Sequence, residues 1–471
     1  MNPQYTDTLG NLPFEDDRQR ELEDALTAMV AEVSRRPLPV SRVTRLLSMG
    51  ALPLKLFGTR TSSFLRQLVV RDEERKALMA KSSEIKQALQ VLHTMGYLRG
   101  VAAKAGQLLA AWPDLAPPKV CELLDSLHFQ APPLNEALVE AQLEAELGAA
   151  PEDIFADFDW QPCAAASIGQ VHRATLKSGE RVAVKIQYPG IARTIRSDLA
   201  NLRTIMYPLR LTHDWRNLMA RIQDIEETVG RECDYRAEAD FTERAREALA
   251  TMDGVVVPRV HRALSTERVL VTDWLEGRHL AAWMARSPSP DTRTRAIETI
   301  LRASARLFYE ERFVWADPSP GNVVFLDSGE IGLLDFGCCL IIDDDDWALT
   351  KTCAKAFHHG GLPSDLELAQ ACDMDEADMK RRPELIPMVR SFVAWLWEPL
   401  QTKGAVHLDE AYFRRGVELL KELTRKRLTR AKPFNTWTNR FYVGLRALFF
   451  RLDAPADYER IHREELGRLQ P

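Results

Sequence analysis

The chain has 471 residues, of which 45% are hydrophobic and 28% charged, and its formal net charge at pH 7 is −6. A chain of this length can bury a large core and divide into several structural units. The small negative charge gives no reason to expect binding to nucleic acid. The 7 cysteines include no C-x-x-C pair, which argues against a disulfide framework or a zinc site.

Two further patterns concern targeting. The N-terminus has no basic stretch followed by an apolar run, so no secretory signal is predicted. No apolar run approaches the roughly 20 residues that cross a bilayer. We therefore expect a cytoplasmic protein without a transmembrane helix, which would meet a membrane only peripherally.

The N-terminal part is predicted to be two extensions, a polar then basic one over residues 1–71 and a helical one over residues 72–157. Residues 34–71 contain 8 basic residues and no Asp or Glu, with leucines between them. Such a stretch can meet anionic lipid head groups, where each basic residue contributes about 1 kcal/mol, or it can be a solvated basic face. Both interpretations stay open.

Residues 158–277 are predicted to form a small lobe. Residues 163–190 indicate three antiparallel strands joined by tight turns, and Lys185 lies on the third strand in a Val-Ala-Val-Lys context. In kinases, a lysine at this strand position contacts the α- and β-phosphates and is held by a helix glutamate. We predict one helix over residues 222–246, and Glu238 on it is the candidate partner of Lys185.

The rest of this lobe is predicted to hold two more strands, at residues 255–258 and 268–277. In a kinase-like fold, the connector that follows them would contact the adenine through its backbone. Residues 278–471 are then predicted to be a second, mostly helical lobe.

Phosphoryl-transfer chemistry is indicated at the start of the second lobe. Asp317 and Asn322 have the spacing D-x-x-x-x-N, and two short apolar runs separate them from the D-F-G that begins at Asp335. This order is typical of a kinase catalytic loop and its metal site. Asp317 suits a carboxylate beside the attacking hydroxyl or water, whereas Asn322 and Asp335 are hard oxygen ligands for Mg²⁺.

Three features after the D-F-G each have a structural and a functional interpretation, and we favour the structural one. The acidic run at residues 343–346 is predicted to begin a helix, because acids there are stabilised by the cap and the helix dipole. Cys338 and Cys339 are predicted to be small buried residues. The aromatic residues 437–451 are predicted to pack in the core, with an interfacial helix as the alternative.

Three further motifs are absent from ordinary protein kinases. They are a K-x-G-Q helix, an alanine-rich loop in place of the kinase glycine-rich loop, and an E-x-D pair. Their residues are Lys104 and Gln107; Ala164, Ala165, Ala166 and Ser167; and Glu232 and Asp234. On these motifs the chain resembles the UbiB/AarF (ABC1-type) atypical kinases, a protein-kinase-like group tied to ubiquinone biosynthesis.

The resemblance implies an α+β, protein-kinase-like two-lobe fold, with a small antiparallel-sheet N-lobe, extra N-terminal helices and a mostly helical C-lobe. It implies ATP or ADP and Mg²⁺ as ligands, with the three motifs beside the nucleotide and Lys104 near Glu232 or Asp234. Such an arrangement guards against phosphorylating proteins in trans. The implied partners are quinone-biosynthesis enzymes, or a lipid or phenolic small molecule, at an anionic membrane surface.

The catalytic loop departs from the family pattern. The usual H-A-D-P-H-P-G-N appears with Trp315 and Ser319 in place of both histidines, whereas Asp317 and Asn322 remain. Binding of nucleotide and Mg²⁺ is therefore still expected. Any proton-transfer or packing role of the two histidines is put in doubt.

Three functions follow from these patterns. The leading one is an ATP-dependent atypical kinase or ATPase in quinone or lipid metabolism. A small-molecule phosphotransferase of the aminoglycoside type shares the D-x-x-x-x-N loop, but the K-x-G-Q and E-x-D motifs argue against it. A low-turnover nucleotide-binding scaffold that organises partner enzymes would need the same binding residues and is the third.

Overall fold

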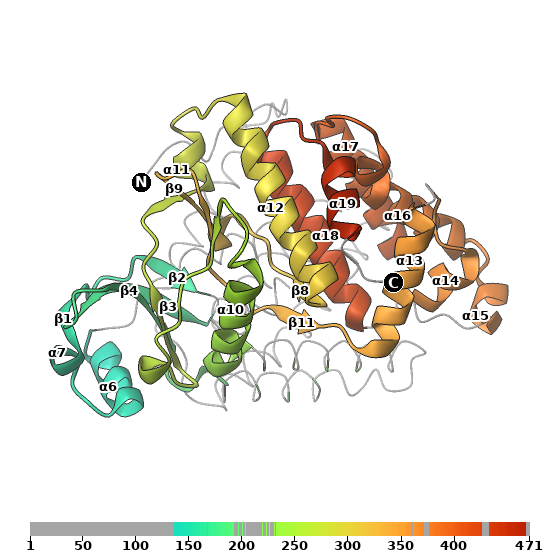
Figure 1. Ribbon diagram of the computed structural model, residues 1–471. Helices are drawn as coiled ribbons and strands as arrows, with labels where there is room; N and C mark the ends of the chain where they lie inside the picture. Colours follow the sequence, from blue (N-terminus) through green and yellow to red (C-terminus); the bar gives the residue numbers. More distant parts are fainter. Residues whose placement is uncertain are drawn as a thin grey trace, which may run out of the picture. The chain divides into compact units, whose positions relative to one another are not determined.

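A computed structural model describes residues 136–467, apart from residue 167, most of residues 193–231, and residues 359–360, 372–375 and 426–432. The chain divides into two compact units, and every element below belongs to the second, Pro133–Leu199 with Pro208–Pro471 (Figure 1). The predictions for residues 1–135, including Lys104 and Gln107, lie outside the described residues, as does Ser167.

The N-lobe is built on an antiparallel sheet in the order β1-β3-β4-β6, with β2 paired to β3. Its strands are β1 (Phe155–Phe158), β2 (Ala164–Ala166), β3 (Gly169–Leu176), β4 (Arg181–Gln187) and β6 (Val269–Asp273). The three strands predicted within residues 163–190 are β2, β3 and β4, so that prediction is confirmed. Gly179 makes the tight turn between β3 and β4, where its φ of +90° is open to glycine.

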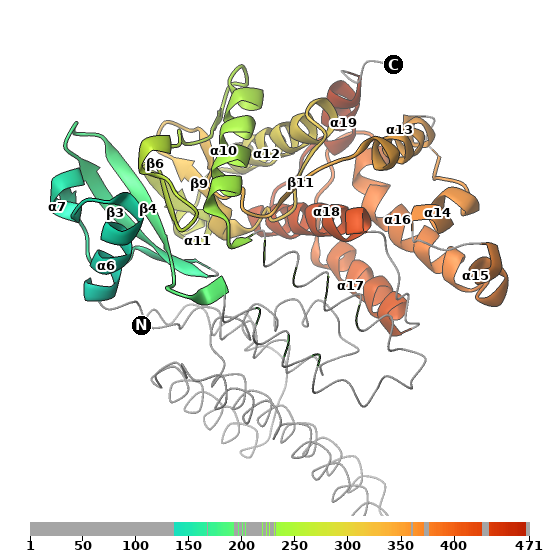
Figure 2. The same ribbon diagram turned by 90° about the horizontal axis from the view of Figure 1, so that it is seen from below.

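Side chains alternate along each strand, so the two faces of this sheet contact different elements. On β4, Val182, Val184 and Ile186 are buried in one cluster with Val139 and Leu143 of α6 (Glu136–Leu147). Because successive side chains point to opposite faces of a strand, Lys185 points away from α6. Figures 1 and 2 show the sheet between α6 and α10 (Tyr235–Leu249), so Lys185 faces the α10 side.

A buried polar pair that includes a titratable histidine also lies in the N-lobe. Gln170 Nε2 lies 2.7 Å from His172 Nε2, and His172 Nδ1 lies 2.8 Å from the Asp159 carbonyl oxygen. Since the Gln170 amide nitrogen can only donate, His172 accepts at Nε2 and donates from Nδ1, which is the neutral imidazole. Burial lowers the pKa of His172 below its usual value, against smaller raising effects of Asp159.

We expect the free energy of unfolding to fall as the pH drops below about 6.5, the pKa of an unfolded histidine. In that range the unfolded chain binds the proton more readily, so stability is complete above pH 6.5 and is lost toward the lower folded pKa. Urea unfolding at pH 7.5 and 5.5 measures this, with His172→Gln as a non-titrating variant. A pH dependence that is the same in His172→Gln would contradict the assignment.

Helix α10 differs from its prediction as part of one helix over residues 222–246. The chain turns at Cys233, and α10 begins at Tyr235. The cause is Asp234, whose side chain accepts a 3.0 Å hydrogen bond from the Arg236 backbone nitrogen and so caps the new helix. This cap places Glu238 in the first turn of α10, where it is buried.

Two smaller sheets lie outside the N-lobe sheet. One has the order β5-β10-β9-β7, with β5 (Val255–Val256), β10 (Ile331–Leu333), β9 (Val323–Leu326) and β7 (Gly277–His279). The other pairs β8 (Phe313–Trp315) with β11 (Cys339–Ile341). The strand predicted at residues 255–258 therefore does not join the N-lobe sheet. A turn at Gly254, with φ of +83°, directs β5 alongside β10.

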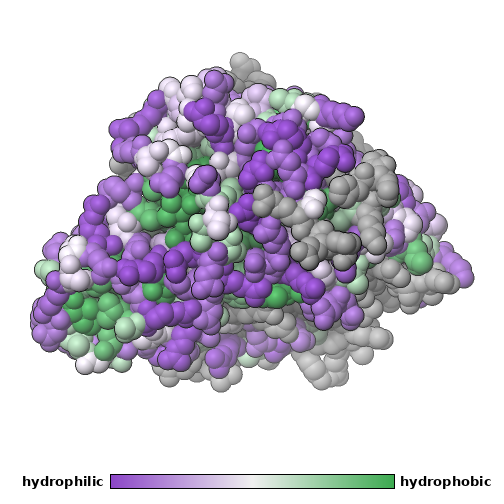
Figure 3. Space-filling view, viewed as in Figure 1, coloured by the Kyte–Doolittle hydropathy of each residue, from purple (hydrophilic) through white to green (hydrophobic). Residues whose placement is uncertain are grey.

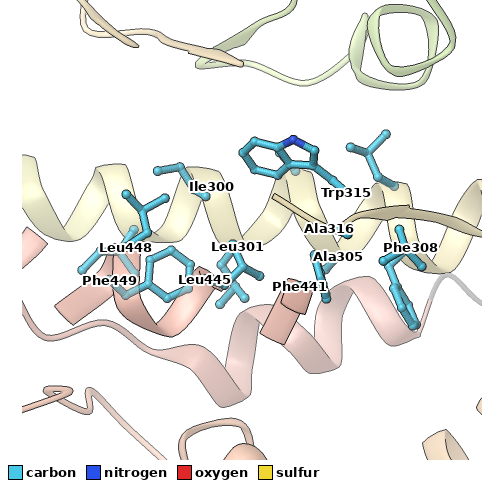
Figure 4. Packing of buried hydrophobic residues seen from close by; sticks show 14 of the residues in the cluster. Ile300, Leu301, Ala305, Phe308, Trp315, Ala316, Phe441, Leu445, Leu448 and Phe449 are labelled. Atoms are coloured by element: carbon cyan, nitrogen blue, oxygen red, sulfur yellow. The ribbon is translucent and has the colours of Figure 1, made fainter. Parts of the chain in front are cut away.

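The C-lobe is mostly helical, as predicted. Its helices are α11 (Leu280–Met284), α12 (Pro290–Glu310), α13 (Asp344–His358), α14 (Asp365–Ala371), α15 (Glu376–Arg381), α16 (Leu385–Gln401), α17 (Glu410–Arg425), α18 (Pro433–Leu452) and α19 (Tyr458–Leu466). Figure 4 shows α12 and α18 packing through Leu301 and Phe308 on one helix and Phe441 and Leu445 on the other. The aromatic tail is thus core, as we favoured.

Two smaller predictions are also confirmed. Asp343 Oδ1 accepts a 2.8 Å hydrogen bond from the Asp346 backbone nitrogen, so the acidic run caps α13. Cys338 and Cys339 are both buried.

The face of the molecule in Figure 3 is largely hydrophilic with small apolar patches. Within the described part of the chain, no helix is both long enough and apolar enough to span a bilayer.

Candidate active site

A lysine with two carboxylate partners lies at the centre of the site. Lys185 Nζ on β4 donates to Glu238 Oε1 and Oε2 of α10, at 2.6 and 2.8 Å, and to Asp335 Oδ2 at 3.0 Å. The Lys185 side chain is 15% exposed and that of Glu238 only 4%, whereas Asp335 is 34% exposed. The fold thus joins Lys185 to Glu238, 53 positions later in the chain, and to Asp335, 150 positions later, with Asp335 the most accessible of the three.

The charges of this group are not balanced. Burial lowers the pKa of Lys185, but Asp335 and Glu238 raise it by more, so the lysine stays protonated. Burial and the negative charge of Asp335 raise the pKa of Glu238 to about 7, against the lowering effect of Lys185. Two carboxylates share one ammonium, so a further cation beside Asp335 would be favoured electrostatically.

The aromatic ring of Tyr235 packs against Lys185. Its ring centroid is 5.0 Å from Lys185 Nζ, within cation–π range. Its hydroxyl approaches Gly169 of β3, where a Cβ atom would lie 2.9 Å from that oxygen and 2.2 Å from the Ile186 carbonyl oxygen. Gly169 therefore allows the close packing of β3, β4 and Tyr235 just after the alanine-rich strand β2.

Asp335 is held at three of its atoms. The backbone carbonyl oxygen accepts a 2.9 Å hydrogen bond from Trp315 Nε1, and Oδ1 accepts one of 2.9 Å from the Gly337 backbone nitrogen. Oδ2 faces Lys185. The next residue, Phe336, is buried between Phe313 and Trp315, with both ring centroids 6.1 Å away. The D-F-G segment is therefore anchored in the core on one side.

The catalytic-loop residues are joined to the D-F-G by a hairpin. Strands β9 and β10 are antiparallel, and the Leu334 backbone nitrogen donates to the Asn322 carbonyl oxygen at 3.0 Å, so Asn322 lies beside Asp335 in the fold. Asn322 Nδ2 donates to the carbonyl oxygen of Asp317 at 3.0 Å and to its Oδ2 at 3.2 Å.

These contacts allow a test of whether the residues suit Mg²⁺. Because Asn322 Nδ2 donates to Asp317, the amide oxygen of Asn322 is not used in these bonds and can serve as a ligand. The site thus offers carboxylate and amide oxygens from Asp317, Asn322 and Asp335, the hard donor set that Mg²⁺ prefers. Mg²⁺ is commonly held by one or two carboxylates together with phosphates and water, so this donor set fits the ion.

Two residues of α18 belong to this site and were missed at the sequence level. A Cβ atom on Gly444 would lie 2.8 Å from Pro318 Cγ, so α18 lies directly against the catalytic loop. Burial lowers the pKa of the Arg440 guanidinium, but nearby Cys338, Asp317 and Glu232 raise it by more. Arg440 thus brings a positive charge to Asp317. No motif marks it, because it lies in a stretch whose aromatic pattern indicated packing alone.

The remaining predicted residues are less tightly joined to the centre. Ala164, Ala165 and Ala166 form the short strand β2, on which the first two are exposed. Glu232 is half-buried and contributes to the electrostatics of both Glu238 and Arg440. Asp234 caps α10. The expected contact of Lys104 with Glu232 or Asp234 lies outside the described residues.

If Lys185 contacts the phosphates, as the sequence predicts, removing its ammonium by Lys185→Met is expected to raise the Kd for ATP at least about tenfold, because a charge-assisted hydrogen bond to phosphate would be lost. The fold should persist, since the pKa of Glu238 is already raised and the acid can take up a proton. Isothermal titration with Mg²⁺–ATP measures the affinity. Lys177→Met, at an exposed lysine on the β3–β4 turn, is the control and should bind like the wild type.

Part of the chain matches a known family. Residues 126–359 match the family model described as the ABC1 atypical kinase-like domain. The chain is 32% identical to the rat atypical kinase COQ8B, mitochondrial, over 68% of this chain and 61% of that protein. It is 31% identical to atypical kinase COQ8, mitochondrial, of Saccharomyces cerevisiae, over 64% of this chain and 60% of the relative.

A plant relative shows the same relation at lower coverage. The chain is 32% identical to ACTIVITY OF BC1 COMPLEX KINASE 3, chloroplastic, of Arabidopsis thaliana, over 54% of this chain and 36% of that protein. In all three relatives the matched stretch is thus less than two thirds of the relative's length.

A solved structure supports the fold. Rv3197 from Mycobacterium tuberculosis, determined in complex with erythromycin, is 24% identical and superimposes with a TM-score of 0.51 over 85% of this chain and all of that one. At this identity the likeness concerns the fold alone, which is the kinase-like two-lobe fold expected from the sequence.

Proposed function

This chain belongs to the ABC1 (UbiB/AarF) family of atypical kinases, and from that premise we propose that it is an ATP-dependent kinase or ATPase. The observation that carries the proposal is the contact of Lys185 with both Glu238 and Asp335. A lysine held by a helix glutamate beside the D-F-G aspartate is the arrangement that kinases require for phosphate binding.

Each residue at the centre has a role in this proposal. Glu238 orients Lys185, which contacts the nucleotide phosphates, and Ala164 to Ala166 cover them. Asp335 and Asn322 hold Mg²⁺, which when bound neutralises negative charge on the phosphates. Asp317 orients the attacking hydroxyl or water, and its position is fixed by the hydrogen bonds from Asn322.

The biological role is proposed from the relatives and the motifs. We place the activity in support of ubiquinone, or another isoprenoid quinone, or in lipid metabolism, with quinone-biosynthesis enzymes or a lipid or phenolic molecule as partners. Residues 34–71 would bring the protein to an anionic membrane as a peripheral protein. The same binding residues would also serve a nucleotide-binding scaffold with little turnover.

The test is hydrolysis of Mg²⁺–ATP by the purified protein, with and without vesicles containing anionic lipid. A thermal melt with nucleotide runs in parallel, in which ligand at 100 times its Kd adds about 2.7 kcal/mol of stability. Hydrolysis that rises with vesicles supports an ATPase acting at membranes. A nucleotide-dependent melt without hydrolysis under either condition would favour the scaffold. No binding at all would exclude both.

A further inference from the structure

Trp315 stands where the family has a histidine, and the structure gives it a defined contact. It is the last residue of β8 and its side chain is fully buried. The indole Nε1, which can only donate, lies 2.9 Å from the backbone carbonyl oxygen of Asp335. The indole ring also packs near the Phe336 ring. Trp315 thus contacts the backbone of the D-F-G through its indole nitrogen.

This contact joins the two halves of the site. Trp315 is followed by Ala316 and Asp317, so β8 leads straight into the catalytic loop. The segment after the D-F-G also pairs with β8. Trp315 is opposite Cys339 of β11, and the Ala316 nitrogen donates a 3.0 Å hydrogen bond to the Cys338 carbonyl oxygen. Asp335 also accepts hydrogen bonds from Gly337 nearby and from Lys185 on the N-lobe.

We infer that Trp315 is a positioning residue for the metal-binding carboxylate, acting through its hydrogen bond to the Asp335 backbone. The inference rests on the proposed function, since it concerns the same Mg²⁺ site. The indole hydrogen bond ties the Asp335 backbone to β8, and Asp317 follows β8 in the chain, so this bond contributes to the spacing between the carboxylate that holds Mg²⁺ and the one that faces the acceptor. An indole supplies the donor at any pH, because it does not titrate.

The test compares two buried tryptophans that make the same kind of bond. Trp315→Phe removes the donor and keeps an aromatic ring, and Trp315→His returns an N–H donor. Trp395→Phe is the matched control, because Trp395 is also buried and its Nε1 donates to a backbone carbonyl, that of Tyr412, at 3.0 Å in the C-lobe. For each variant the Kd for ADP is measured with Mg²⁺ and with EDTA, beside the thermal melt of the nucleotide-free protein.

We expect Trp315→Phe to raise the Kd for ADP in the presence of Mg²⁺ by about five- to tenfold, and to change the Kd in EDTA much less. Trp315→His should recover most of the Mg²⁺-dependent affinity. Trp395→Phe should lower the melting temperature by about as much as Trp315→Phe lowers it, and it should leave both Kd values unchanged. This pattern separates positioning of the metal ligand from a general loss of stability.

Four outcomes would overturn the inference. Equal changes of both Kd values in Trp315→Phe would show a structural role alone, as would a matching effect of Trp395→Phe. Unchanged Mg²⁺-dependent affinity in Trp315→Phe would show that the bond does not position Asp335, while the proposed function stood. Failure of the wild type to bind ADP with Mg²⁺ would instead remove the proposed function and the inference with it.

Discussion

The Asp335→Asn substitution is expected to abolish Mg²⁺-dependent nucleotide binding and to lower ATP hydrolysis at least about a thousandfold, or some 4 kcal/mol of transition-state stabilisation. The amide keeps the shape and the oxygen that accepts from Gly337 but removes the negative charge that a divalent cation needs. Titration of ADP with Mg²⁺ and with EDTA, beside steady-state hydrolysis, measures the two effects.

The variant should nonetheless fold, and that makes the result specific. Lys185 retains both hydrogen bonds to Glu238, and removal of the Asp335 charge takes away one cause of the raised pKa of Glu238. The nucleotide-free melting temperature is therefore expected to stay close to that of the wild type. Asp327→Asn, at an exposed aspartate in the β9–β10 turn, is the control and should behave as wild type. Wild-type affinity for Mg²⁺–ADP in Asp335→Asn would refute the metal-site assignment.

Much of the site's framework could be predicted because its signals are local. Alternating apolar residues in β4 decide that Lys185 points away from the buried face, and the turn at Gly179 fixes the pairing of β3 with β4. The two apolar runs between Asn322 and Asp335 become the hairpin β9–β10, which brings the residues together. Period, turn chemistry and motif order all agree at these points, and the kinase-like fold follows from them.

Other features escaped prediction because they depend on contacts distant in sequence. The end of one helix and the start of α10 are decided by a side-chain cap at Asp234, which a helical apolar pattern does not reveal. The position of β5 is set by its partner β10, which follows it by some 75 residues. Arg440 and Gly444 reach the catalytic loop from α18, and a periodic apolar pattern predicts only that such a helix is buried.

Gly416 on α17 is the position where a single added methyl group should cost the C-lobe most. A Cβ atom there would lie 2.1 Å from Trp395 Cζ2 and 2.3 Å from Cε2, well inside van der Waals contact. The Trp395 ring cannot move aside easily, because its Nε1 donates to the Tyr412 carbonyl oxygen and Tyr412 Oη donates to that of Trp395, both at 3.0 Å. Helices α16 and α17 would have to separate.

We expect Gly416→Ala to lower the free energy of unfolding by about 3 kcal/mol, even though alanine in an exposed helix is favoured over glycine by about 1 kcal/mol. Urea unfolding measures the change, and Gly230→Ala is the control. Gly230 is an exposed helical glycine with no atom within 4 Å of the added Cβ, so its substitution should be neutral or stabilising.

A double-mutant cycle tests the cause of this loss. Trp395→Ala alone removes a buried ring and destabilises the lobe, but it also vacates the space that the Gly416→Ala methyl group needs. The two changes together should therefore cost less than the sum of their separate effects, by about 1–3 kcal/mol. Additive effects would mean that the methyl group meets something other than the indole, and a wild-type unfolding curve for Gly416→Ala would mean that α16 and α17 do not pack this closely.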